Sequence, residues 1–422
     1  MSRAPLYRRL PWISIAIALA VVLSAAFAVA PVREVATHED VNEVALDRPL
    51  AYVALAPLSN VLDMITLLSR AQHIAFVAGI VVIFAAWRGY RAWHGRRSWR
   101  DHVVPALALF VGLLAVYAAV ALLPRPMAAL VTADANIVRI DFHSHTSASH
   151  DVRSSWTAER NREWHRAGGY DVAFVTDHGE VSQAERALVS NPTPAGGGVT
   201  LLQAIEVTWS GEHVAIIGAE RSYKGLLTQS HRDVDPQALQ LASLIPEREP
   251  VVIWHHPRVL SRLAAASGPR TAGVRAIEIS NGAPDSMDEV RRGRERIIAL
   301  ARRNNLMMTT GSDSHGWGRT APNWTMLMIY NWRALSADAL SAQIENVIRK
   351  GAFAGSRVVE RRAATGTDPF TLGLTILAAP LRMLTTLSID ERVAWLIWIA
   401  LITLAPRFVR GLNFRVDRSP RA

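Results

Sequence analysis

Long apolar runs without charged residues lie near both ends of the 422-residue chain, whereas its middle alternates short apolar runs with amphipathic stretches. The clearest apolar runs are residues 12–30, 71–87, 103–123 and 393–406. A helix of about 20 apolar residues spans the roughly 30 Å hydrocarbon core of a bilayer. The pattern predicts a polytopic membrane protein with membrane regions at 1–133 and 361–422 and a water-soluble domain at 134–360.

The first apolar run has an alternative interpretation as a cleaved signal peptide. Ala28-Val29-Ala30 would then supply the small residues of a cleavage site. The run is longer than the apolar part of a usual signal peptide, however, and further apolar runs follow it. We therefore expect residues 12–30 to form an uncleaved membrane helix.

Two weaker stretches, residues 50–68 and 370–387, decide how many times the chain crosses the membrane. The first contains Asp63, and the second contains Arg382, so each is suited to the membrane surface as well as to its interior. If both lie at the surface, four spans remain. If both cross the bilayer, the chain has six.

Arginines beside the apolar runs predict the orientation. The segment between the second and third runs carries Arg88, Arg91, Arg96, Arg97 and Arg100. Short Arg-rich loops are retained in the cytoplasm. With four spans, both termini and this loop lie inside, and the middle domain lies on the extracytoplasmic side of an inner (plasma) membrane. If residues 50–68 cross the bilayer, the loop and the domain exchange sides, against the charge pattern.

The composition narrows the chemistry. The net charge is +10, but the only lysines are Lys224 and Lys350, and many arginines flank the apolar runs. No aromatic-interleaved basic stripe occurs in the middle region, so a nucleic-acid partner is not favoured. The absence of cysteine excludes disulfides, thiolate zinc sites and a cysteine nucleophile.

The middle region is typical of an α/β fold. Short β-rich runs occur at 137–142, 172–176, 200–207, 214–217, 251–254, 276–280, 306–310 and 325–330. Amphipathic stretches at 156–167 and 286–304 lie between them, and a further helix follows the last run up to Lys350. The stretch 286–304 opens with the residue spacing of a capping box, from Ser286 to Glu289. Alternating strands and helices predict a mainly parallel sheet or barrel.

Histidines and carboxylates gather at or just after the ends of these predicted strands. They are His143, His145, Asp177, His178, Glu206, His213, His255, His256, Asp313 and His315. In an α/β barrel this is the face at which active sites are built. Mixed imidazole and carboxylate ligands suit Zn, Mn or Fe. The number of ligands exceeds the need of one ion, so two or three divalent ions are expected, and such sites activate water for attack on phosphoryl groups.

The ordered motifs DFHSHTSASHD, VTDH, the lone Glu206, His213, HHP and GSDSH resemble the polymerase and histidinol phosphatase (PHP) superfamily of metal-dependent phosphoesterases. The resemblance covers roughly residues 138–357. It implies a distorted (β/α)7 barrel, flanked here by transmembrane helices, with up to three ions. The implied ligands are His143, His145, His178, Glu206, His213, His256, Asp313 and His315, with Glu206 as the bridging carboxylate.

One position departs from the common spelling of that family. Many members have Ser-Asp-Gly after the His-x-His pair, whereas this chain has Ser149-His150-Asp151-Val152. Either His150 or Asp151 is then a ligand, and we slightly favour His150 because it occupies the usual Asp position.

Several neighbours of the implied ligands have other expected roles. Adjacent residues of a strand face opposite sides, so His255 is expected to pack against the sheet. Arg258 is a candidate for phosphate binding, although the start of a solvated helix is the stronger interpretation. A further group is expected to orient the imidazoles: Asp177, Glu180, Glu278 and Asn281.

These patterns lead to a membrane-anchored phosphoesterase that hydrolyses a phosphate ester with metal-activated water. The substrate would be a small phosphorylated compound or a phosphorylated lipid. Multinuclear His/Asp barrels also support amide hydrolysis, so a hydrolase of another bond is the first alternative. A membrane sensor that binds metal without turnover is the second. The identity of the substrate is beyond the sequence.

Overall fold

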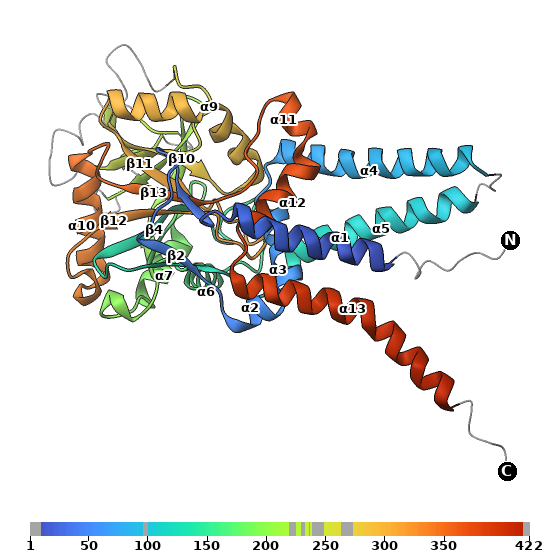
Figure 1. Ribbon diagram of the computed structural model, residues 1–422. Helices are drawn as coiled ribbons and strands as arrows, with labels where there is room; N and C mark the ends of the chain where they lie inside the picture. Colours follow the sequence, from blue (N-terminus) through green and yellow to red (C-terminus); the bar gives the residue numbers. More distant parts are fainter. Residues whose placement is uncertain are drawn as a thin grey trace.

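The computed structural model describes residues 10–95, 100–218, 225–228, 233–235, 237–238, 249–262 and 273–416. An α/β domain occupies one side of the molecule, and long helices project from its other side (Figure 1). Arg96 and Arg97 of the Arg-rich loop lie outside the described residues.

The first sheet has six strands and contains the first predicted strand near its middle. Its order is β1 (Val32–Glu34), β13 (Arg357–Arg361), β12 (Asn323–Met328), β4 (Ile137–Ser144), β5 (Val172–Val175) and β6 (Thr200–Gln203). The strands β4, β5 and β6 are parallel, whereas β12 runs antiparallel to both β4 and β13.

The second sheet has five strands. Its order is β11 (Met307–Gly311), β10 (Val274–Asn281), β9 (Val251–Trp254), β8 (Glu212–Ile217) and β7 (Ile205–Trp209). β9, β10 and β11 are parallel, but β8 runs antiparallel to both of its neighbours. The turn before β8 explains this direction: only Ser210 and Gly211 separate β7 from β8, and both have positive φ (52° and 76°). Such a two-residue turn joins antiparallel strands, whereas a parallel connection needs a crossover.

The expectation of a closed, mainly parallel barrel is therefore corrected to a mixed α/β fold with two sheets. Within the described residues, single bridges connect the sheets, from Ser144 to Ser314 and from His178 to Glu206. The predicted run 200–207 is in fact two strands, β6 and β7, which break at Ala204 and belong to different sheets. Both bridges lie where the predicted metal ligands lie.

Helices surround the two sheets (Figure 1): α6 (Ala158–Gly168), α7 (Ser182–Val189), α9 (Pro284–Arg303) and α10 (Ala337–Lys350). The capping box predicted at Ser286 is wrong. The helix α9 starts earlier, with Pro284 in its first turn and no side-chain cap. Proline suits this position because it needs no hydrogen-bond acceptor there. Ser286 is thereby free to bond to Asp313 instead, through its hydroxyl at 3.0 Å.

The N-terminal region, for which only membrane helices were expected, also contributes short strands. β1 extends the first sheet by pairing antiparallel with β13, and β2 (Val44–Asp47) pairs with β3 (Ala129–Thr132). Strands of three or four residues carry too little alternation to be recognised in a sequence. They attach the α/β domain to the segments that lead into and out of the projecting helices.

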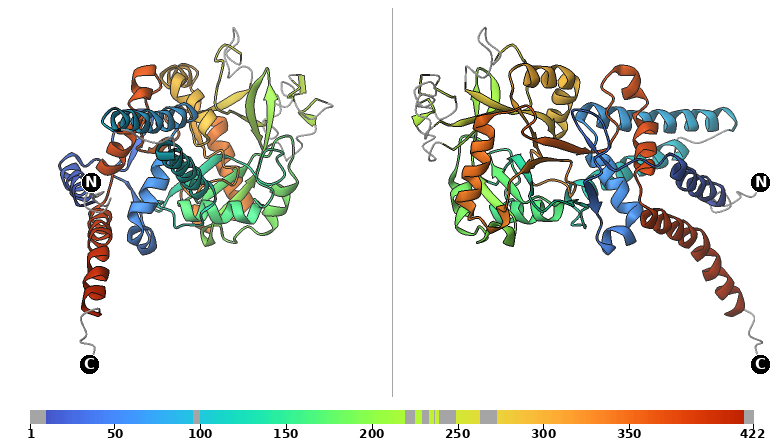
Figure 2. Two further views of the ribbon diagram at one scale, coloured as in Figure 1. Left: turned by 90° about the vertical axis from the view of Figure 1, so that its right-hand side faces the viewer. Right: turned by 60° about the vertical axis from the view of Figure 1, so that its left-hand side comes forward.

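The remaining helices lie on the other side of the domain. They are α1 (Leu10–Leu23), α2 (Leu50–Ala54), α3 (Ala56–Thr66), α4 (Arg70–Trp93), α5 (Arg100–Leu122), α11 (Pro369–Gly373), α12 (Thr375–Thr385) and α13 (Ile389–Val416). α1, α4, α5 and α13 project away from the domain in the same general direction (Figures 1 and 2). By length and composition, α4 and α5 are the two described helices able to cross a membrane.

The two weaker apolar stretches form short helices. Residues 50–68 contain α2 and α3, and residues 370–387 contain the end of α11 and all of α12. The longer helix of each pair has 11 residues, which is about half the length needed to cross a bilayer. Neither of these helices is long enough to cross a bilayer alone, and the position of both stretches relative to the membrane stays a prediction.

Candidate metal centre

The predicted ligands converge at the ends of strands from both sheets. The segments that carry them are β4 with the residues after it, the turn after β5, β7, β8, the turn after β9 and the loop after β11. Two backbone hydrogen bonds hold the first and last of these together, from Asp313 N to His143 O (2.8 Å) and from His145 N to Ser314 O (3.2 Å). Ligand residues far apart in the sequence are therefore fixed by main-chain bonds.

Glu206 lies at the middle of this cluster and is 1% exposed. Its Oε2 atom lies 3.3 Å from His143 Nε2, 3.4 Å from His145 Nε2 and 3.2 Å from His178 Nδ1. Its Oε1 atom faces a second group of imidazoles, with His213 Nδ1 at 3.0 Å. Each carboxylate oxygen thus has its own set of nitrogens, which is the arrangement that a bridging carboxylate would require.

Asp313 completes the inner side of the cluster. Its Oδ1 atom lies 3.5 Å from His143 Nε2, 3.3 Å from His145 Nε2 and 3.4 Å from His315 Nδ1. Its other oxygen, Oδ2, accepts hydrogen bonds from the side chains of Asn281 and Ser286. The backbone of Asp313 has φ 50°, a left-handed conformation that is strained for a non-glycine residue. Local strain of this kind is found at functional sites.

The donor atoms fit divalent metal ions. Four triplets have donor atoms within 4.8 Å of one another: His145/His178/His315, His143/His145/Asp313, His143/Glu206/His256 and His178/Glu206/His213. Among the described residues, buried atoms Glu206 Oε2, His143 Nδ1 and His255 Nε2 have no hydrogen-bond partner. A buried carboxylate oxygen without a partner is unfavourable. A cation bound between these nitrogens and oxygens would remove that cost, and mixed N and O donors suit Zn, Mn or Fe.

Asp151 and His150 occupy different positions relative to the cluster. Asp151 Oδ2 lies 3.4 Å from His178 Nε2 and 3.3 Å from His315 Nε2. The exposed His150 faces His178 only through its ring, with the centroids 5.5 Å apart. The geometry therefore favours Asp151 as the additional ligand, which reverses the preference based on the position of His150 in the motif.

The expectation that His255 packs away from the site is wrong. Its side chain is buried in the cluster, stacked on His143 with the ring centroids 3.8 Å apart, and its Nδ1 lies 3.4 Å from Glu206 Oε1. Strand β9 ends at Trp254, so the alternation of side chains no longer holds at His255 and His256. The next residue, His256, also reaches the cluster, with its Nε2 atom 3.9 Å from Glu206 Oε1.

Glu289, on α9, was not predicted from the sequence as a site residue. It accepts a hydrogen bond from His256 Nδ1 at 3.0 Å and pairs with Arg258 Nε at 2.9 Å. Arg258 does not begin a helix: it lies in an irregular turn, and its backbone N–H donates to Glu212 at 2.8 Å. Its guanidinium is half-exposed beside the cluster, so a role in phosphate binding stays a prediction.

A shell of buried carboxylates supports the ligand segments. Asp141 accepts hydrogen bonds from the backbone of His143 and Ser312 and from His165 Nε2 at 2.8 Å. Glu278 accepts from the backbone of His256 at 2.7 Å and lies 3.5 Å from His143 Nδ1. Asp141 and Glu278 thus orient segments that carry imidazoles. Asn281 orients the carboxylate of Asp313 by a hydrogen bond.

Asp177 and Glu180, which were expected to orient imidazoles, bond to hydroxyl and backbone N–H groups instead. Asp177 accepts hydrogen bonds from the hydroxyls of Thr146 and Ser149. Ser149 Oγ lies 3.3 Å from His145 Nδ1, so Asp177 acts on the imidazole through this hydroxyl. Glu180 accepts from the backbone N–H groups of the two residues that follow it, which fixes the turn after β5.

Charge and burial shift the protonation equilibria of the cluster. Burial lowers the pKa of both His178 and His255 to about 4, which keeps these imidazoles in the neutral form that binds metal. Burial alone would lower the pKa of His315, but its hydrogen bond to Asp151 and the charge of Asp313 raise it to about 9. For Glu206, the effect of burial is outweighed by His143, so its pKa is well below the ordinary value.

A cavity of about 610 Å³ opens beside the cluster and gives access to it. Asp151, Asp313 and His315 line one wall. Ligand pockets typically measure about 300–1,000 Å³, so the cavity has room for a substrate next to the proposed ligands.

Comparison with known proteins gives partial similarities to solved structures. PsfC from Pseudomonas syringae shows 17% identity and a TM-score of 0.36, over 58% of this chain and 98% of its own. The lesion-specific endonuclease EndoQ from Pyrococcus furiosus shows 16% identity and a TM-score of 0.37, over 53% of this chain and 57% of its own.

A two-domain protein from Bacteroides vulgatus, described as containing a predicted PHP-like metal-dependent phosphoesterase, shows 18% identity and a TM-score of 0.33, over 53% of this chain and 65% of its own. No family model matches the chain, and no curated protein matches it either. These scores are too low to transfer a substrate or a residue role to this chain. The assignment of the site therefore depends on its own geometry.

Proposed function

We propose that this chain is a membrane-anchored, metal-dependent phosphoesterase that uses two or three divalent ions. The position of Glu206 carries the proposal, because each of its oxygens faces a separate group of imidazoles. The resemblance of the motifs to the PHP superfamily adds support for a phosphate ester as the substrate. The ligand set would comprise the residues predicted from the sequence, with Asp151 favoured over His150 and with His255 added.

The residues of this chain would hold the ions and exclude bulk water. When bound, divalent metals polarise a phosphoryl oxygen and lower the pKa of water. Glu206 would join two ion positions, while Asp313, held by Asn281 and Ser286, would fix the inner one. Arg258, whose guanidinium pairs with Glu289 at 2.9 Å, would be the candidate to hold a substrate phosphate.

An assay of the full-length protein in detergent tests this function. The protein is stripped with a chelator, reloaded with Zn, Mn or Fe(II), and offered phosphomonoesters, phosphodiesters and amides. Hydrolysis of a phosphate ester that needs the metal is expected. Asp313→Asn is the matched variant: it should lose part of the metal and most of the activity while keeping the fold. Unchanged metal content and turnover in that variant would contradict the site.

The same assay separates the alternatives. Turnover of amides without turnover of phosphate esters would indicate a hydrolase of another bond. Full metal occupancy with no hydrolysis of any compound would indicate a sensor. One solved neighbour is an Endonuclease Q complex with DNA that carries an abasic lesion, so such DNA belongs in the panel. We expect no cleavage of it, because the middle region has no basic stripe interleaved with aromatics.

Membrane anchoring is supported by the exposed apolar surfaces of α4 and α5. Ile74 and Val82 on α4 are 64% and 65% exposed, and Phe110 and Leu114 on α5 are 64% and 61% exposed. Helices with such surfaces are not core helices of a soluble domain, and lipid would cover them. We place the α/β domain on the extracytoplasmic side, because the segment between α4 and α5 is rich in arginine.

Fusions at Thr367, after β13 and before α11, test this orientation without removing a strand. A β-lactamase fusion should confer ampicillin resistance, and a green fluorescent protein fusion should stay dark. The opposite pair of results would place the domain in the cytoplasm. The β-lactamase reporter is preferred because the protein's own hydrolysis of phosphate esters does not interfere with it.

A further inference from the structure

The cavity beside the metal centre extends to the projecting helices. Its lining includes Asp151, Asp313 and His315 at one end. At the other end it includes Tyr117, Val120 and Ala121 of α5, His73 of α4 and Thr66 of α3. One continuous space therefore touches the proposed metal ligands and the bases of both candidate membrane spans.

The wall between these two ends is fixed to the helices. The loop that carries Asp313 and His315 continues to Gly318, whose backbone N–H donates to Ala121 O of α5 at 3.0 Å. Gly318 has φ 78°, a left-handed backbone conformation that favours glycine. The start of α4 is held by Ala71 N, which donates to Asp288 of α9 at 2.8 Å. The bases of both candidate spans are thus hydrogen-bonded to the domain that carries the proposed metal ligands.

The surroundings of the cavity resemble the boundary between water and hydrocarbon. Beyond the cavity, α4 and α5 project away from the domain with exposed apolar side chains (Figures 1 and 2). Trp317 and Arg70 both line the cavity, and Trp317 is 52% exposed. Tryptophan and arginine are favoured at the level of lipid headgroups.

We propose that the substrate is a membrane lipid that carries a phosphate ester and enters the cavity from the bilayer between the bases of α4 and α5. This inference rests on the proposed phosphoesterase function. The phosphate would lie at the metal centre, and the acyl chains would follow the apolar surfaces of the two helices. A small water-soluble phosphate ester would leave the helix end of the cavity unused.

The reaction is a hydrolysis. The oxygen of water forms a bond to phosphorus, and the bond between phosphorus and the ester oxygen breaks. A proton from the water passes to the departing alkoxide, so the products are an alcohol and a phosphate. No oxidant, reductant or further substrate is needed.

Ala121→Trp tests the route, because a large side chain at this half-buried position fills the helix end of the cavity and leaves the backbone bond to Gly318 intact. Ala115→Trp is the matched control, since Ala115 is exposed on α5 and does not line the cavity. Both are measured as the metal-loaded, full-length protein in mixed micelles. Metal content per protein reports whether each variant is folded.

Dioleoyl phosphatidic acid and dioleoyl phosphatidylglycerol are the lipid probes, and p-nitrophenyl phosphate is the soluble probe. Ala121→Trp should lower the turnover of lipid at least tenfold and change that of the soluble ester less than twofold. Ala115→Trp should leave both unchanged. Trp317→Ala, a milder change at an exposed residue, should raise the KM for lipid without changing kcat. The lipid route would be overturned if metal-replete Ala121→Trp lost the turnover of lipid and of the soluble ester equally. It would also be overturned if this variant kept the turnover of both.

Binding of fluorescent phosphatidic acid gives a second readout that does not depend on turnover. Wild type and Ala115→Trp should bind it, and Ala121→Trp should bind it at least tenfold more weakly. If the wild-type protein hydrolyses no phosphate ester but this binding pattern holds, the phosphoesterase function fails and the lipid site stands. If soluble esters are hydrolysed but the lipid binds all three proteins equally, the function stands and the lipid site fails.

Discussion

Two buried carboxylates, Asp63 and Glu206, differ in what surrounds them. Asp63 Oδ1 lies 2.6 Å from Arg125 and accepts a hydrogen bond from Thr320, while its Oδ2 lies 2.6 Å from Arg361 and accepts from Tyr52. Glu206 is surrounded by imidazoles and, among the described residues, its Oε2 has no hydrogen-bond donor. Asp63 is neutralised by permanently charged arginines, whereas the groups that face Glu206 are imidazoles, whose charge depends on bound protons.

This difference indicates that the Asp63 cluster stabilises the fold, whereas the Glu206 cluster is suited to binding metal. Arginine stays charged and does not coordinate metals, so the Asp63 cluster is complete once the chain has folded. Imidazole is neutral or protonated near physiological pH and is the commonest metal ligand. The Glu206 cluster therefore needs an exchangeable cation, either protons or metal. The first cluster joins α3 to β13 of the α/β domain, and the second is suited to catalysis.

The largest expected effect follows from removing the charge of Glu206. Glu206→Gln should lower kcat/KM by at least about a thousandfold, because transition-state stabilisation worth about 4 kcal/mol is lost when a shared ligand is removed. Metal analysis should show the loss of more than one ion per protein, since a bridging carboxylate serves two. Loss of one ion at most would show that Glu206 does not bridge.

Removing the carboxylate charge of Asp63 should instead lower the stability of the protein and leave its activity unchanged. Asp63→Asn leaves Arg125 and Arg361 buried without their counter-charge, so the free energy of unfolding should fall by about 3–5 kcal/mol. Thermal unfolding in detergent measures this fall. Protein that remains folded should keep its metal ions and its turnover. A loss of metal from the folded fraction would remove the distinction between the two clusters.

A smaller effect decides the outer ligand of the metal cluster. Asp151→Ala removes the carboxylate that lies between His178 and His315 and should weaken metal binding by about tenfold or more. His150→Ala should change metal affinity by less than about twofold. Titration of the chelator-stripped protein with Zn measures both. The reverse ranking would return the ligand role to His150, as the position in the motif suggested.

The sequence predicted the part of the site that depends on strand ends. Ligands such as His143 and His178 were predicted because short β-rich runs are recognised from neighbouring residues alone. The carboxyl ends of such strands lie at one face of an α/β domain. The position of His255 was missed because side-chain alternation stops where β9 ends. Glu289 was missed because its contact with His256 depends on how α9 packs, which no local pattern encodes.

The fold was predictable to a similar extent. The eight runs correspond to strands, but their directions and their division into two sheets depend on turns such as Ser210-Gly211 and on the break at Ala204. The short strand β1 was invisible because its partner, β13, lies more than 300 residues away in the sequence. Long-range pairing, and not local propensity, determines these features.

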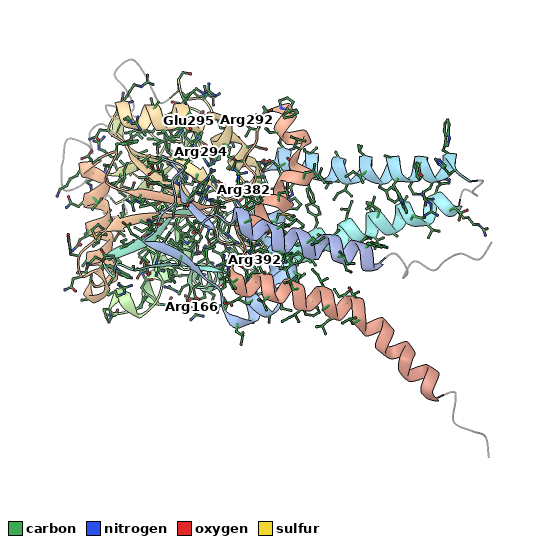
Figure 3. The ribbon with its side chains drawn as sticks, viewed as in Figure 1. Arg166, Arg292, Arg294, Glu295, Arg382 and Arg392 are labelled. Atoms are coloured by element: carbon green, nitrogen blue, oxygen red, sulfur yellow. The ribbon has the colours of Figure 1, made fainter. Side chains whose placement is uncertain are left out.

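The smallest expected effect is a pH dependence in a third buried cluster, which resembles that of Asp63. Glu360 receives two hydrogen bonds of 2.9 Å from Arg294 (Figure 3) and two from Arg33, of 2.8 and 3.1 Å. Burial alone would raise the pKa of Glu360, but the arginines outweigh it and hold the pKa far below its ordinary value of 4.5. A lowered pKa in the folded state stabilises the protein above the unfolded-state value, and this contribution is lost as the pH falls below it.

The test compares chelator-stripped wild type with chelator-stripped Glu360→Gln between pH 7 and pH 3, so that metal loss affects neither. The wild type should be more stable at pH 7, and the difference in the free energy of unfolding should narrow below about pH 4.5, by up to about 1.4 kcal/mol per pH unit. Glutamine cannot titrate, so the narrowing isolates Glu360. If the difference in the free energy of unfolding stays constant with pH, the arginines do not hold Glu360 ionised. The argument that arginines alone neutralise a buried carboxylate, made above for Asp63, would then fail.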